Sequence, residues 1–201
     1  MTTASGSRRL LLFLTIGVAG LAAAATTDSP AAVADLFGAR LGMSRAAVLA
    51  QAPGTCTGEG DGGPDRLFAQ CGARALSAGF TAAERAWWVT ASYDMTGTAY
   101  RLPAVRAALE ARYGEAVDLG GGTLVWLPAG SAADAGRCLT QAMLLTAALD
   151  LRAARGNATG LPVVAADCLP IRSALLAERD GHRGVVVELR DPRARVAELT
   201  R

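Results

Sequence analysis

Residues 86–95 read AWWVTASYDM, and they carry the clearest strand pattern in the chain. Every second residue is apolar, and most of the residues between them are polar. The apolar set is Trp87, Val89, Ala91, Tyr93 and Met95. Successive side chains of a strand point to opposite faces, so this pattern predicts a strand with one buried and one polar face. We expect Trp87 in the core, and Trp88, Thr90 and Ser92 on the polar face.

Helix and strand patterns on both sides of this strand predict a mixed domain. N-terminal to it, the expected elements are a short strand at 36–41, a helix at 45–52 capped by Ser44, and a strand at 67–71. C-terminal to it, they are a helix at 103–113, a strand at 123–127, a hairpin of 174–178 and 185–189 with a five- or six-residue loop, and a last helix after Asp191-Pro192. Residues 139–151 alternate like a strand but are rich in alanine, and we favour the strand over the helix. The prediction is an α+β fold, with short helices packed on an antiparallel sheet, in one domain over 36–201.

The first 25 residues have the three-part layout of a secretory signal peptide. Arg8 and Arg9 precede an apolar run over 10–25, and small residues at 23–25 suit cleavage. A retained membrane anchor is the alternative, but the run has 16 residues and a bilayer usually needs about 20. We expect cleavage after Ala25, a flexible lead-in over 26–35, and a periplasmic or secreted protein without a stable membrane anchor.

The charged residues exclude several kinds of chemistry. All 20 basic residues are Arg and the single His is His182, so a Schiff-base lysine, a P-loop lysine and a two-histidine metal site are excluded. Without residues 1–25, 18 Arg balance 18 Asp and Glu. A neutral domain has no electrostatic attraction to a phosphate backbone, so we expect no nucleic-acid partner. We also expect no cofactor and no metal.

Four cysteines lie beyond the signal segment: Cys56, Cys71, Cys138 and Cys168. An even number in an exported chain predicts disulfides, and four cysteines allow three pairings. We favour the sequential pairs Cys56–Cys71 and Cys138–Cys168. A zinc site or a redox dithiol would need a close pair of the C-x₂-C type, which the sequence lacks.

Candidate sites are few. Any Ser-His-Asp arrangement would have to use His182, which lies in a glycine-flanked turn and is expected to be solvated. Acids in the glycine-rich loop 58–65 match a calcium loop poorly. Paired carboxylates remain as a catalytic option. Trp88, beside Thr90 and Ser92 on a polar face, is typical of an interface anchor, unless the protein's own loops cover it.

Leu41-Gly42-Met43-Ser44, followed by a short helix, a loop and a strand, resembles the opening of small bacterial envelope domains. These are the outer-membrane assembly lipoprotein and β-lactamase-inhibitory-protein-like group. A helix closing on Arg112-Tyr113-Gly114, then Trp126, Cys138 and Cys168, resembles uncharacterised exported proteins of proteobacteria. The resemblance implies an α+β fold and protein binding rather than catalysis, although the 58–65 loop and the missing acyl-anchor cysteine depart from the lipoprotein pattern.

The predicted function is therefore that of a non-catalytic envelope protein, periplasmic or secreted. It is expected to bind another protein or a ligand through a sheet face that carries Trp88, Thr90 and Ser92, and the candidate partner is another envelope protein. The alternative is a cofactor-free hydrolase that uses paired carboxylates.

Overall fold

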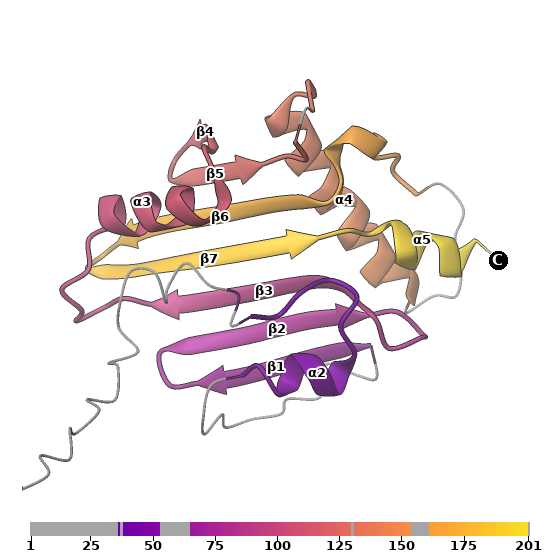
Figure 1. Cartoon of the computed structure of the whole chain (residues 1–201), viewed down its shortest axis with the longest axis horizontal. Coiled ribbons are helices and arrows are strands. Elements are labelled where there is room, and N and C mark those ends of the chain that lie inside the picture. Colours follow the sequence, from indigo (N-terminus) through magenta and orange to yellow (C-terminus); the bar gives the residue numbers. More distant parts are fainter. Residues whose placement is uncertain (1–35, 37, 53–64, 130, 154–160, 201) are drawn as a thin grey trace, which may run out of the picture.

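A computed structural model describes residues 36, 38–52, 65–129, 131–153 and 161–200 (Figure 1). In this part of the chain, seven antiparallel strands form one sheet in the order β1-β2-β3-β7-β6-β5-β4. The strands are β1 (Arg66–Cys71), β2 (Arg74–Phe80), β3 (Ala86–Asp94), β4 (Val117–Gly120), β5 (Thr123–Trp126), β6 (Ile171–Arg179) and β7 (His182–Arg190). The helices are α2 (Arg45–Leu49), α3 (Leu102–Tyr113), α4 (Ala135–Ala153), the 3₁₀ turn η1 (Ala166–Cys168) and α5 (Arg193–Leu199). The predicted α+β fold, with helices on an antiparallel sheet, is confirmed.

The sheet has two differently covered faces. Helices α2 and α3 lie on one face, in front of the sheet in Figure 1, where Val48, Val105 and Leu109 are fully buried in the largest core cluster. Helix α4 lies on the other face, behind the sheet in the same view, and packs in two smaller clusters. The chain therefore forms three layers, and residues of 161–164 and of α5 pack beside α4 on the second face.

The sequence pattern gave several elements correctly. Ser44 caps α2, its Oγ accepting a hydrogen bond from the Ala47 N–H at 3.2 Å, and the helix ends three residues earlier than expected. The predicted hairpin is β6–β7, but its turn has two residues, since Arg179 pairs with His182. Asp180 and Gly181 have φ of 52° and 80°, the backbone that such a tight turn requires.

Other expectations are wrong. The strand at 36–41 is absent from the described residues there, which form turns closed by the Ala39 N–H donating to the Leu36 carbonyl at 2.9 Å. Residues 139–151 belong to helix α4, not to a strand. The buried residues of α4 recur every three or four positions and form one helical stripe: Ala135, Cys138, Ala142, Leu145 and Leu149. The alternating set combined buried Leu145 and Leu149 with exposed Met143 and Ala147, so the alternation does not follow burial.

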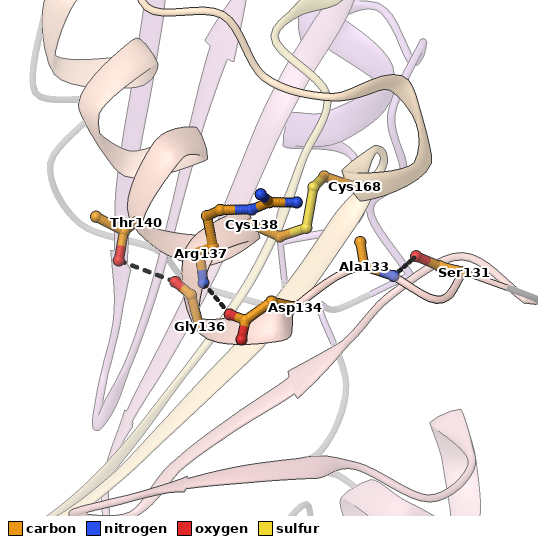
Figure 2. Close-up of a disulfide and its surroundings, with 8 residues drawn as sticks. All are labelled: Ser131, Ala133, Asp134, Gly136, Arg137, Cys138, Thr140 and Cys168. Carbon is orange, nitrogen blue, oxygen red and sulfur yellow. Dashed lines mark hydrogen bonds between the residues drawn. A yellow bond between two sulfur atoms is a disulfide. The ribbon is translucent and has the colours of Figure 1, made fainter.

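A disulfide between Cys138 and Cys168 fixes the N-terminal part of α4 to η1, which precedes β6 (Figure 2). The Cα atoms are 5.3 Å apart and both residues are fully buried. Next to it, the Arg137 N–H donates to Oδ1 of Asp134 at 2.6 Å, which satisfies a donor of the first turn. This pairing confirms one predicted bridge. Cys71 has no free thiol, but its predicted partner Cys56 lies outside the described residues, as do 1–25, 26–35 and most of the 58–65 loop.

Candidate functional site

Thr90 and Ser92 lie on the sheet face that carries α4. Residues in register across antiparallel strands share a face, and Thr90 is in register with Ser77 of β2 and Glu188 of β7. Ser92 is in register with Val186 of β7 in the same way. We call the part of this face that none of the described elements covers the open sheet face. It comprises Phe68, Ser77, Thr90, Ser92, Leu175, Val186 and Glu188.

Helix α4 crosses this face along one end of the sheet. Its first turns pack against β5 and β6, Thr146 Oγ1 lies 3.3 Å from an Nη atom of Arg190 in β7, and Asp150 forms an ion pair with Arg66 of β1 at 2.5 Å. These contacts run from one side of the sheet to the other. The helix therefore forms a wall beside the open sheet face, and does not cover it.

A β-bulge changes the expected position of Trp87, whereas Trp88 shares a face with Thr90 and Ser92 as expected. The register shifts between Gly79 and Phe80, so that Phe80 pairs with Ala86 and Trp87 is the extra residue. Trp87 is buried, as expected, but it packs against Leu145 and Leu149 of α4 instead of the α2–α3 core. Strict alternation therefore fails at Trp87.

Trp88 packs in the same cluster as Trp87, and it is half-buried. The two rings meet edge to face, with centroids 6.2 Å apart. Its indole lies directly over Gly79 of β2, where a Cβ atom would come within 2.1 Å of the Trp88 Nε1. That Nε1 is buried and has no hydrogen-bond partner. Trp88 therefore lies on the sheet next to α4. Thr90 and Ser92 lie on the same face and belong to the open sheet face.

Thr90 belongs to a polar network at the foot of the wall. Its Oγ1 lies 3.4 Å from Oε1 of Glu188, the other carboxylate oxygen pairs with Arg190, and Arg190 donates to Thr146. Arg190 is buried, so its charge needs this carboxylate partner. The network joins β3, β7 and α4, and it fixes the position of the wall relative to the open sheet face.

Large apolar side chains lie around the polar residues of the open sheet face. Phe68 of β1 is 42% exposed, Leu175 of β6 is 44% exposed and Met143 of α4 is 53% exposed. Between Met143 and the sheet lies a pocket of about 270 Å³. Its lining consists of Thr123, Leu139, Met143, Ser173, Ala174, Leu175, Val186 and Glu188. A mostly apolar hollow with a few hydroxyl groups and one carboxylate suits an apolar side chain of a partner.

Three carboxylates among the described residues have shifted pKa values. Hydrogen bonds from Thr96 lower the pKa of Asp94, and hydrogen bonds from Gly120 and Arg106 lower that of Asp118. Burial alone would raise the pKa of Glu198, but hydrogen bonds from the backbone and from Arg195 outweigh it and lower the pKa. In each case the hydrogen bonds stabilise the charged carboxylate.

Within the described ranges, no group of three or more His, Cys, Asp and Glu side chains is placed to hold a metal ion. His182, the sole histidine, is exposed at the start of β7, next to the hairpin turn. In the part of the chain that the structure describes, none of the helices is long and apolar enough to cross a membrane.

No protein-family model, curated protein or solved structure matches this chain. The candidate site is therefore defined by the geometry of this structure alone. Sequence reasoning placed Thr90 and Ser92 on the face but missed Met143 and Leu175, which the α4 wall and β6 bring together. The signal that could have found Met143 is the helical spacing of Cys138, Ala142, Leu145 and Leu149, which leaves position 143 beside the buried stripe.

Proposed function

We propose that this chain is an exported, non-catalytic envelope protein that binds another protein through its open sheet face. One observation carries the proposal: exposed apolar side chains of β1, β6 and α4 surround a floor of serine and threonine hydroxyls. Apolar side chains gathered beside polar groups mark interaction sites on soluble proteins more often than scattered ones do. Such a mixed surface is also the usual composition of a non-obligate interface.

The expected compartment agrees with this role. The Cys138–Cys168 disulfide favours an oxidising compartment, and the sequence predicts a signal peptide at 1–25. The resemblance of the Leu41–Ser44 segment to small envelope domains supports a binding role in the same compartment.

The geometry suggests how a partner would be held. An aliphatic or aromatic side chain of the partner would enter the pocket between Met143 and Leu175, and the hydroxyl groups of Thr90 and Ser92 would bond polar groups at its edge. Glu188 is already neutralised by Arg190, so the site needs no cationic partner. Affinity would depend mainly on the apolar contacts, with hydrogen bonds setting the orientation.

Two neighbouring residues of α4 provide a matched test. Met143 and Leu144 are 53% and 57% exposed, but only Met143 lines the pocket. Mature protein would first be used to capture partners from an envelope extract, and the affinity of each purified partner would then be measured directly. Met143→Asp should weaken binding at least tenfold, because it places a charge in an apolar contact. Leu144→Asp should leave binding unchanged, and equal effects of the two variants would refute this site.

A further inference from the structure

Arg172 stands out on the opposite face of the sheet, under α3. It alternates with Ser173 along β6, so its side chain points away from the open sheet face, and it is in register with Trp126 of β5. Its guanidinium carbon lies 3.8 Å from the ring centroid of Tyr113, at the end of α3. The guanidinium is therefore stacked on an aromatic ring at half depth in the protein.

No carboxylate of the described ranges forms an ion pair with this arginine. Its Nε is buried without a hydrogen-bond partner, and its Nη atoms have no partner there either but are not buried. Burial lowers the pKa of Arg172, and the nearby charge of Arg112 lowers it further. Arg112 lies over the same Tyr113 ring, 5.7 Å from its centroid. Two guanidinium groups thus share one ring.

Other partly buried arginines in the described chain are neutralised or bonded. Arg190 pairs with Glu188, and Arg195 pairs with Asp65 and Glu198 at 3.1 and 3.0 Å. Burying an arginine without such partners costs free energy, because its hydration is lost and nothing replaces it. Arg172 differs from both because no described carboxylate pairs with it. Its Nε is buried, but solvent can reach its two Nη atoms.

The surroundings of Arg172 hold its ring partner in place. Tyr113 meets Trp126 edge to face, with centroids 5.7 Å apart, and the Trp126 Nε1–H donates to the Gly114 carbonyl at 2.8 Å. The negative end of the α3 dipole explains a cation at Arg112, in the last turn of the helix. It does not explain a second, half-buried cation on the adjoining strand.

We propose that Arg172 and Arg112 form a binding site for an oxyanion, the group that carboxylates and phosphate esters share. The anion would accept charge-assisted hydrogen bonds from the Nη atoms of Arg172 and would neutralise its charge, and the nearby positive charge of Arg112 would add to the attraction. Stacking on Tyr113 holds the guanidinium plane in advance, so little side-chain freedom is lost on binding. The site lies on the other face from the proposed protein-binding surface and does not depend on it.

The test measures stabilisation of the purified full chain by sodium phosphate and by sodium acetate, each against sodium chloride at equal ionic strength. An anion that binds the native state raises the melting temperature with the logarithm of its concentration. Arg172→Met keeps the apolar stem and removes the charge, and we expect at least a tenfold loss of anion affinity. Arg112→Gln should weaken binding by a smaller factor. Arg179→Met removes the same charge from the same strand at a position whose side chain is 91% exposed, and should change nothing.

The outcomes separate the explanations. A shift with phosphate alone or with acetate alone supports the site and identifies the preferred anion. Three results overturn the proposal: neither anion stabilises the protein beyond chloride, Arg172→Met lowers the melting temperature but keeps the full anion response, or Arg179→Met loses the response as Arg172→Met does. The second result would mean that Arg172 only packs on Tyr113.

Discussion

Adding a methyl group at Gly79 should disturb the Trp88 ring that lies over it. A Cβ atom at Gly79 would come within 2.1 Å of Nε1, 2.6 Å of Cδ1 and 2.8 Å of Cε2 of Trp88. An indole is rigid, so Gly79→Ala must push the whole ring away from β2 and out of its contacts beside α4. Overpacking of this kind typically costs about 1–3 kcal/mol.

The cost should disappear when Trp88 is removed. In a Trp88→Ala background the new methyl group has space, and an alanine in a strand is more stable than a glycine by roughly 0.5–1 kcal/mol. The two changes should therefore be coupled by about 1.5–4 kcal/mol, with the double variant more stable than the sum of the single variants predicts. The sign of the coupling follows from the contact alone.

Urea unfolding of the four proteins in the cycle gives the coupling, provided that the m-values agree. Ser77→Ala, two residues along β2 and on the same face, serves as the control and should show no coupling with Trp88→Ala. Additivity of Gly79→Ala and Trp88→Ala within about 0.5 kcal/mol would refute the stacked arrangement.

Three further outcomes are expected. Trp87→Ala should destabilise the fold by about 3–5 kcal/mol in denaturant unfolding, because a buried aromatic ring leaves a cavity against α4. Replacing both Cys138 and Cys168 by Ala should cost about 3.5 kcal/mol, since the bridge closes a loop of 30 residues, and an unchanged denaturation midpoint would contradict this. Glu198 has a lowered pKa, so the stability it provides is complete above its ordinary value of 4.5 and is lost as the pH falls through the lowered pKa. At neutral pH, Glu198→Gln should therefore have a lower melting temperature than the native sequence. In acid, the two melting temperatures should converge.

The fold class could be predicted because local patterns in this sequence mostly agree with the tertiary structure. The alternation from Val89 to Tyr93, the Ser44 cap and the β6–β7 hairpin all depend on neighbouring residues. Strands β2 and β4 were missed. The β2 sequence contains small residues and a glycine, and β4 has four exposed residues, so neither carries a strong strand signal.

The site was less predictable, because its key features depend on distant contacts. The alternation gives opposite faces for Trp87 and Trp88, whereas the bulge opposite Gly79 and Phe80 turns both toward α4. A bulge arises from strand pairing, which the sequence of one strand does not specify. The juxtaposition of Met143 with Leu175 likewise requires the path of α4 across the sheet. Thr90 and Ser92 were placed correctly because they lie beyond the bulge.

Strand β4 also limits how copies of this protein can associate. It forms one edge of the sheet, has only four residues, Val117–Gly120, and its register shifts between Asp118 and Gly120. A long, flat and regular edge would offer unpaired backbone groups to the same edge of another copy and would favour aggregation. At the β4 edge, this row of unpaired backbone groups is short. It is also interrupted by the irregular register and by the charged Asp118. The protein can therefore expose apolar groups on its open sheet face at high concentration without a ready route to edge-to-edge polymerisation through β4.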